Sequence, residues 1–215
     1  MSQIIVLMGP QGAGKGTQGQ KLAGILNMPI VGTGDMLREV AKSGSLLGHQ
    51  VKQIQEAGQL VSDDILRQVV KERTIKDDCS RGYILDGFPR TITQAEMLEE
   101  IAQAQGHTVL AVNIDAPREL LWKRLTGRRT CTQCGEIYNI YYMPSEREGV
   151  CDKDGASLYA RSDDNEEAIS KRLSLYDEKT KPILDYYRRS GRLHDIDGAG
   201  TPEEVFGKIA PLFGL

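Results

Sequence analysis

The sequence is poor in the features that mark exported, membrane-spanning or nucleic-acid-binding proteins. In 215 residues it has 4 cysteines, 3 histidines and 1 tryptophan, and its formal net charge is −3. The apolar run from Ile4 to Gly9 is short and lacks a basic leader, so we expect a strand there, and neither a signal peptide nor a membrane span. Nucleic acid is not an expected partner, because binding it requires a basic surface.

The few cysteines and histidines also restrict the chemistry. Without an export signal, the cysteines are expected to remain reduced thiols, some of them bound to metal, and not to form a disulfide framework. None of the histidines has motif neighbours, so no catalytic histidine is expected. We therefore expect a cytoplasmic protein that acts on small molecules without a membrane partner, and a monomer, because nothing in the sequence forces association.

Short apolar runs alternate along the chain with amphipathic segments. The pattern predicts strands at 3–8, 82–86, 108–114 and 193–196, and helices at 16–26, 91–104 and 117–125. One long helix is predicted where spacings of three and four separate Ile169, Leu173, Tyr176, Thr180, Ile183 and Tyr187. The predicted fold class is therefore α/β, with a doubly wound parallel sheet.

Two stretches interrupt this alternation. Residues 33–58 resemble short helices with small residues between them, whereas 128–160 are rich in Cys, Tyr, Gly and Pro and have no helical period. We interpret both as insertions over the ligand edge of the sheet. The expected organisation is a core of 1–32, 62–127 and 162–215, with inserted segments at 33–61 and 128–161.

The loop after the first strand has the composition of a phosphate-binding loop. It reads Gly9-Pro10-Gln11-Gly12-Ala13-Gly14-Lys15-Gly16-Thr17. Between a strand and a helix, its backbone N–H groups can surround a polyphosphate. Lys15 can reach between the transferring groups, and the Thr17 hydroxyl can serve phosphate or metal. A chance glycine turn is the alternative, which the lysine in register disfavours.

A second motif follows a later strand and reads Tyr83-Ile84-Leu85-Asp86-Gly87-Phe88-Pro89-Arg90. It places an aspartate at the carboxyl end of a buried strand, the edge where open α/β sheets bind ligands. Asp86 is therefore a candidate for ordering hydrated Mg²⁺. Its alternative role is to cap the turn before Gly87.

Two similar turns form a third motif, Cys131-x-x-Cys134-Gly135 and Cys151-x-x-Asp154-Gly155. Their spacing is typical of a tetrahedral zinc site. Each turn ends in a glycine, whose positive φ would let backbone amides face the ligand atoms, and this parallel favours Asp154 over Asp152 as fourth ligand. Four ligands leave no open position, so structural Zn²⁺ is expected. The alternative is a metal-free segment with adventitious thiols.

These motifs resemble those of the adenylate kinases, a family of nucleoside monophosphate kinases. The first loop is similar to their GxPGxGKGT, with Gln11 in place of the usual proline. Residues 86–90 match their DGFPR signature, 33–38 match TGDMLR, and the Cys-Cys-Cys-Asp lid resembles that of some bacterial members. The resemblance covers essentially the whole chain. It implies reversible transfer between ATP and AMP with ADP as product, Mg²⁺ as cofactor and Zn²⁺ in the lid.

The resemblance also implies residue roles. It implies that ATP is bound by Gly12, Ala13, Gly14, Lys15, Gly16, Thr17, Arg124, Arg128, Ile137, Tyr138 and Gly200. It implies that AMP is bound by Thr33, Arg38, Gln59, Leu60, Val61, Gly87, Phe88, Pro89, Arg90, Gln94, Arg161 and Arg172. Within this set, the resemblance implies that Gln59 to Val61 line the base and that Gln94 reads the adenine edge. The implied catalytic residues are Lys15, Asp86, Arg90, Arg128, Arg161 and Arg172. For any single arginine, a solvated basic face balanced by Asp163, Asp164, Glu166 and Glu167 is the alternative.

Three other functions are compatible with parts of this pattern. A kinase with UMP, CMP or GMP as acceptor would keep the fold, but Gln94 and the long lid argue against it. A P-loop regulatory switch would not need the DGFPR segment or arginines for a second nucleotide. A zinc-ribbon nucleic-acid adaptor is disfavoured by the acidic charge and by the lack of an aromatic and basic stripe.

Overall fold

The computed structural model describes residues 2–57, 59 and 61–215. At its centre lies a parallel sheet with the strand order β2-β3-β1-β4-β8. The strands are β1 (Gln3–Met8), β2 (Ile30–Gly32), β3 (Gly82–Asp86), β4 (Thr108–Asp115) and β8 (Leu193–Asp197). The predicted α/β fold with a parallel sheet is confirmed.

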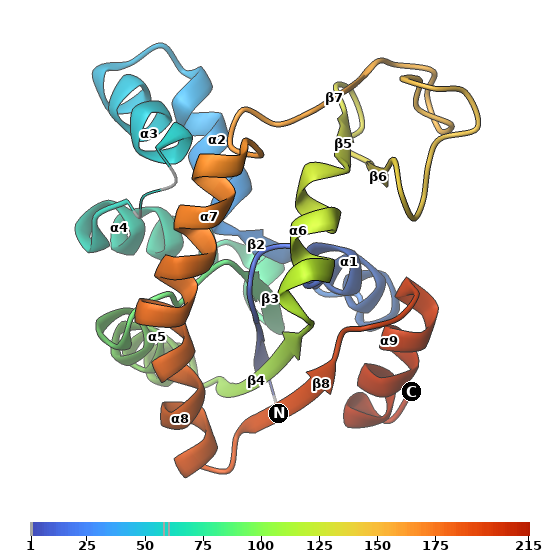
Figure 1. Cartoon of the computed structure of the whole chain (residues 1–215). Helices are drawn as coiled ribbons and strands as arrows, with labels where there is room; N and C mark the ends of the chain where they lie inside the picture. Colours follow the sequence, from blue (N-terminus) through green and yellow to red (C-terminus); the bar gives the residue numbers. More distant parts are fainter. Residues whose placement is uncertain (1, 58, 60) are drawn as a thin grey trace.

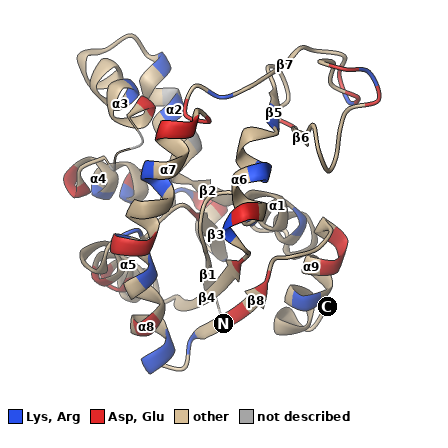
Figure 2. Cartoon of the chain, viewed as in Figure 1, with Lys and Arg blue, Asp and Glu red and all other residues tan. Residues whose placement is uncertain are grey.

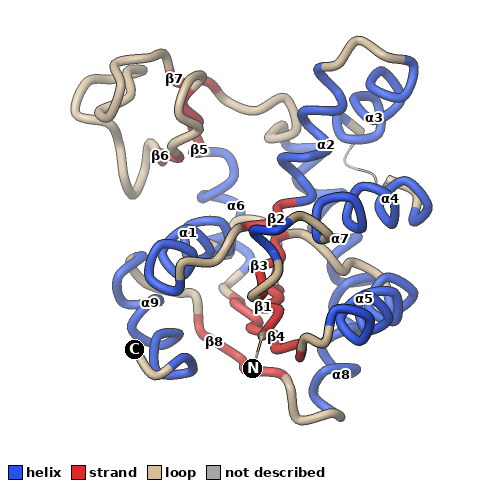
Figure 3. The backbone as a smooth tube through the Cα atoms, turned by 180° about the vertical axis from the view of Figure 1, so that it is seen from behind, coloured by secondary structure: helices blue, strands red, loops and turns tan. Residues whose placement is uncertain are grey.

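Helices cover both faces of the sheet (Figures 1 and 3). In chain order they are α1 (Lys15–Leu26), α2 (Thr33–Lys42), α3 (Leu46–Glu56), α4 (Asp63–Thr74), α5 (Ile92–Gln105), α6 (Arg118–Thr126), α7 (Glu166–Leu175), α8 (Lys181–Arg189) and α9 (Pro202–Ile209). Short 3₁₀ turns lie at Asp77–Cys79 and Ala210–Phe213. Each of these helices is too short or too polar to cross a lipid bilayer, a statement that covers the described residues.

The layering follows from the two-residue period of β1. Ile4 and Val6 belong to a buried cluster that includes side chains of α5 and α8. Ile5 and Leu7 belong to a second cluster, with side chains of α1 and α9. Because successive side chains point to opposite faces of a strand, a strand that is apolar throughout needs cover on both faces. Figure 3 shows these two helix pairs on opposite sides of the sheet.

The neighbouring strands β1 and β3 send the chain to opposite faces. The first leads into α1 and the second into α5, so the strand order reverses between them. Open α/β sheets bind ligands at the carboxyl ends of strands where such a reversal occurs. The glycine-rich loop after β1 and residues 87–90 after β3 both lie at this edge. We therefore expect the ligand-binding site there.

The two predicted insertions extend from the same end of the molecule (Figure 1). The first contains α2 and α3 and shares a small separate core of Leu37, Val51, Val61 and Leu66. The second contains an antiparallel sheet of order β6-β5-β7, formed by β5 (Arg128–Cys131), β6 (Ile137–Asn139) and β7 (Leu158–Tyr159). The sequence does not predict these strands, because runs this short carry no readable two-residue period.

The prediction of a single long helix near the end of the chain is wrong in one detail. Between α7 and α8 the residues Tyr176–Thr180 form a π-helical turn. Pro182 explains the wider turn: it has no N–H for the carbonyl of Glu178, and its ring would clash with that carbonyl in an α-helix. The predicted face is nonetheless correct, because all six of its residues are buried.

Substituting two glycines of the loop after β1 should separate backbone strain from steric overlap. Gly9 has φ +129°, and a Cβ there would lie 2.0 Å from the carbonyl oxygen of Ile114, whereas Gly14 has φ +101° and open space around it. Gly9→Ala should therefore lower the free energy of unfolding by about 2 kcal/mol more than Gly14→Ala, as urea denaturation would measure. Equal losses in the two variants would contradict the close packing of this loop against β4.

Candidate functional site

The loop between β1 and α1 encloses the side chain of Lys15. Its Nζ donates to the carbonyl oxygens of Gly9 and Pro10, each at 2.8 Å. Positive φ angles at Gly9, Gly12 and Gly14 shape this loop and favour glycine over other residues. Gly14 is also the N-cap of α1 and has no side chain that could cap the helix. The first N–H groups of α1 can therefore donate hydrogen bonds to an anionic ligand.

Lys15 is a partly buried cation among other cations. Burial lowers its pKa from 10.5 to about 8; Asp86 opposes this shift, and Arg90, Arg172 and Arg128 add to it. The predicted loop lysine, the carboxylate of the second motif and three of the predicted arginines therefore act on one another electrostatically. An anion placed among them would stabilise the charged form of Lys15.

The predicted arginines form a partly buried basic cluster. Burial, with a smaller contribution from Arg172, lowers the pKa of Arg90 to about 10. Burial and the charge of Arg128 likewise lower the pKa of Arg161 to about 10, and burial lowers that of Arg172. Arg38 contributes to all three shifts. The cluster is assembled from distant parts of the sequence, because Arg38 lies on α2, Arg128 on β5 and Arg172 on α7; Figure 2 shows basic residues on these three elements.

Two carboxylates orient part of this cluster, and the sequence indicates no role for them beyond that of counter-charges. The Asp164 carboxylate accepts from Nε of Arg128 at 2.7 Å, and its side chain is only 2% exposed. The Asp163 carboxylate lies 3.0 Å from Nη1 of Arg172. The sequence signal for this role is a pair of adjacent acids between the lid and α7, flanked by Arg161 and Arg172. The low exposure of their side chains cannot be predicted from the sequence.

Arg124 lies apart from the cluster and joins two loops. It donates to the carbonyl oxygens of Gly198 at 3.1 Å and Gly200 at 3.0 Å, and more weakly to that of Gly12 at 3.4 Å. Burial lowers its pKa. Three residues that were predicted to bind ATP, namely Gly12, Arg124 and Gly200, are thereby linked. The loop after β8 is held against the phosphate loop.

Two further predicted ATP ligands, Ile137 and Tyr138, lie on β6 in the lid. The side chain of Tyr138 is buried, and its hydroxyl lies 3.5 Å from Sγ of Cys151 and accepts from the backbone N–H of Asp152 at 2.8 Å. Its side chain therefore belongs to the interior of the lid. Ile137 precedes it and pairs with Thr130 of β5.

The predicted AMP residues surround the end of β3. Thr33 Oγ1 donates to the carbonyl oxygen of Asp86 at 3.4 Å, and Arg90 Nε donates to that of Gly87 at 2.7 Å. The Phe88–Pro89 peptide is cis, and Phe88 is buried. Gln94 is fully buried, and both ends of its amide are hydrogen-bonded within the protein.

The residues that the resemblance predicts to line the base, Gln59 to Val61, do not share one environment. Val61 is buried in the small core of the first insertion, whereas Gln59 is exposed and donates its backbone N–H to the carbonyl oxygen of Ile54 at 2.9 Å. Leu60 lies outside the described residues. The structure therefore brings the phosphate-binding candidates together more closely than the base-binding ones.

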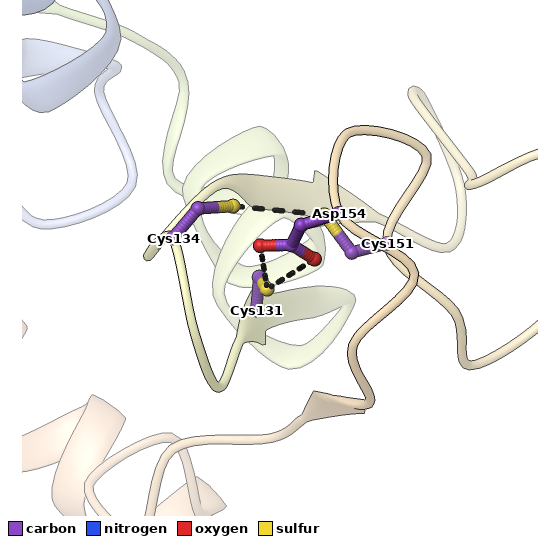
Figure 4. Close-up of side chains that lie close together, drawn as sticks. All are labelled: Cys131, Cys134, Cys151 and Asp154. Carbon is purple, nitrogen blue, oxygen red and sulfur yellow. Dashed lines mark hydrogen bonds between the residues drawn. The ribbon is translucent and has the colours of Figure 1, made fainter.

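The predicted zinc ligands converge in the lid (Figure 4). Sγ of Cys134 and Cys151 are 3.6 Å apart, Sγ of Cys131 lies 3.3 Å from Oδ1 of Asp154, and the ligand atoms all lie within 4.8 Å of one another. Tetrahedral zinc with thiolate bonds of about 2.3 Å would separate its sulfur atoms by about 3.8 Å, so the four groups fit this metal.

The two turns have the backbone predicted for them. Gly135 has φ +74° and Gly155 has φ +73°. The backbone N–H of Gln133 points to Sγ of Cys131 at 3.4 Å, and that of Ala156 donates to Oδ1 of Asp154 at 2.9 Å. Asp152 instead accepts from the backbone of Glu146. Asp154, and not Asp152, therefore lies in one group with the three cysteines, where the sequence predicts the fourth ligand.

Comparison with known proteins gives a consistent result. A family model described as adenylate kinase matches residues 7–192. Similar proteins named adenylate kinase include one from Thermodesulfovibrio yellowstonii, 45% identical over 209 residues and 97% of each chain. Another, from Bacillus subtilis, is 44% identical over 211 residues, 98% of this chain and 97% of the relative. A third, from Archaeoglobus fulgidus, is 43% identical over 206 residues and 95% of each chain.

Metal removal should lower the thermal stability of the protein. Binding of zinc to the folded state alone contributes about 4 kcal/mol when the free metal exceeds its dissociation constant a thousandfold. We expect zinc by mass spectrometry and a lower Tm by calorimetry after chelation. Cys134→Ser should lose the metal, whereas Cys79→Ser, a change in a thiol outside the site, should retain it. A protein without metal, or equal loss in both variants, would contradict the assignment.

Proposed function

The chain belongs to the adenylate kinase family, and we propose that it catalyses the reversible, Mg²⁺-dependent transfer of a phosphoryl group from ATP to AMP, giving two ADP. The observation that carries this proposal is the partly buried basic cluster around Lys15 and Arg90. ATP and AMP together bring about six negative charges, and guanidinium groups bind phosphate oxygens bidentately. The negative charge of two nucleotides would balance the positive charge of this cluster, whereas the charge of one phosphate group would leave most of it unbalanced.

Positioning and charge stabilisation account for the proposed catalysis. Phosphoryl transfer passes through a loose transition state, with charge spread over the equatorial oxygens. Lys15 would exchange its two carbonyl partners for phosphate oxygens at the point of transfer, and Arg90 would hold the phosphate of the acceptor. Asp163 and Asp164 would hold Arg172 and Arg128 in place, so that these charges need not reorganise during the reaction.

Asp86 is the proposed contact to hydrated Mg²⁺. Carboxylate oxygens suit this ion, and the carboxylate lies close enough to Lys15 to raise its pKa. When held there, Mg²⁺ would supply positive charge that neutralises part of the negative charge of the phosphates. The Asp86 carboxylate would also offset part of the positive charge of Lys15 and Arg90 in the empty site.

The two insertions are the proposed moving parts. We expect residues 33–61 to close over AMP and 128–161 to close over ATP, each relative to the core of 1–32, 62–127 and 162–215. Arg128 and Arg161 lie at the two ends of the lid and would be brought to the phosphates by its closure. A closed site excludes water, the competing acceptor. Zinc would keep the lid rigid and take no part in the chemistry.

Location and assembly are proposed on separate grounds. Metal-binding thiolates and nucleotide substrates both fit the reducing cytoplasm, and Cys131, Cys134 and Cys151 are free thiols. All proposed ligands come from one chain, so a monomer is sufficient for the reaction. Light scattering coupled to size-exclusion chromatography would test this.

A coupled assay with ATP and each nucleoside monophosphate tests the proposed function directly. We expect ADP formation with AMP, much less with UMP, CMP or GMP, and only trace hydrolysis of ATP without an acceptor. Arg90→Ala should raise KM for AMP more than for ATP, because its guanidinium lies on the acceptor side. Rapid hydrolysis of ATP alone would contradict the proposed closure.

Lys15 should take up a proton when MgATP binds above its lowered pKa. Phosphates stabilise the cation, so at about pH 9 uptake should approach one proton, and at about pH 7 it should be close to zero. The same shift should make the free energy of unfolding of the empty enzyme rise between about pH 8 and pH 10.5, because the unfolded chain holds more protons there. Calorimetry in buffers of different ionisation enthalpy measures the uptake.

Lys15→Met is the matched control for this measurement. It should remove the proton uptake and most of the turnover while changing folding stability little, because the wild-type lysine is desolvated in the empty site. Uptake that persists in Lys15→Met would assign the proton to another group.

A further inference from the structure

The amide of Gln94 lies between two partners of opposite hydrogen-bonding character. Its Oε1 accepts from the backbone N–H of Arg90 at 2.7 Å, and its Nε2 donates to Oδ1 of Asp63 at 2.5 Å. Gln94 has no exposed surface, and Asp63 is partly buried at the first position of α4. No motif in the sequence indicates a role for Asp63.

These partners fix which way the amide points. A backbone N–H can only donate, and a carboxylate can only accept. Rotating the Gln94 amide by half a turn would set its NH₂ against the N–H of Arg90 and its oxygen against the charged carboxylate of Asp63. Both hydrogen bonds would become repulsive contacts in a buried environment, where an unpaired polar group is costly.

Both partners are themselves held in place. The carbonyl oxygen of Arg90 accepts from the hydroxyl of Thr180 at 3.1 Å, and the guanidinium of Arg90 donates back to the carbonyl oxygen of Gly87 at 2.7 Å. Asp63 is part of α4, whose Leu66 packs in the small core of the first insertion. The amide therefore cannot regain its bonds by moving either neighbour slightly.

The fixed amide has one lone pair on Oε1 and one hydrogen on Nε2 left over. A purine with a 6-amino group presents an N–H donor beside the N1 acceptor, which matches this remaining pair. A 6-oxo purine presents an acceptor beside an N1–H donor, and needs the amide in the opposite orientation.

We propose that Asp63 is a specificity-determining residue, whose carboxylate locks the Gln94 amide in the orientation that accepts 6-amino purines and rejects 6-oxo purines. This rests on the proposed function and on the role that the resemblance implies for Gln94, in which neighbouring side chains move aside and the buried amide contacts the base of the acceptor nucleotide. Asp63 touches no substrate and acts through Gln94, so it is a positioning residue. An asparagine at position 63 would not serve, because its own amide can turn and donate to a rotated Gln94.

The test compares AMP with IMP, which differs from AMP at the 6-amino group and the N1 proton. Asp63→Asn is the variant, and Asp64→Asn is the matched control: it makes the same charge change in the same helical turn, on an exposed side chain. We expect the wild type to favour AMP strongly in kcat/KM. The ratio of kcat/KM for AMP over IMP should fall about tenfold in Asp63→Asn, the worth of one charged hydrogen bond, and stay unchanged in Asp64→Asn.

The outcomes separate this inference from the proposed function. A wild type that forms no ADP from AMP would refute the proposed function. A wild type that uses IMP as well as AMP, or an Asp63→Asn variant that loses activity equally with both, would overturn the role of Asp63 alone. If Asp63→Asn does not fold, Asp63→Ser supplies the same comparison, since serine is well tolerated at a helix N-terminus.

Discussion

Like charges are confined at the carboxyl edge of one parallel sheet, and the rest of this structure is arranged around that constraint. Lys15, Arg90, Arg161 and Arg172 are all buried enough for their pKa values to fall, and their mutual repulsion adds to the effect. Carbonyl oxygens around Lys15 and the carboxylates of Asp163 and Asp164 compensate part of this charge. Phosphate groups are the ligands that would compensate the remainder.

The fold makes this confinement possible by drawing the cations from separate elements. Lys15 follows β1, Arg90 follows β3, Arg128 and Arg161 flank the lid, and Arg172 lies on α7. In the empty protein, the two proposed moving insertions can lie at a distance from the core. Nucleotides that bridge them would then draw the insertions together, so closure and charge compensation become one event. Zinc in the lid fits this picture, because a segment with strands of two to four residues has little core of its own.

The sequence predicts this molecule best where chemistry and local backbone coincide. The glycine-rich loop, the residues after β3 and the two metal turns each need particular residues at fixed spacing, and all three were readable. Asp63, Asp163 and Asp164 were not, because their roles depend on burial and on partners distant in the chain: Asp63 and Gln94 are 31 residues apart. The π-helical turn was missed because the apolar spacing stays regular through it, although Pro182 was visible.

We infer that the partly buried cations serve to bind phosphate and do not hold the fold together. The free energy of unfolding of Arg90→Met, measured without nucleotides and with saturating AMP, tests this. Methionine keeps much of the volume of the arginine side chain while removing its charge. We expect the free energy of unfolding of the empty variant to stay within about 1 kcal/mol of the wild-type value, or above it, while AMP stabilises only the wild type appreciably. A loss of several kcal/mol in the empty variant, with AMP stabilisation intact, would contradict it.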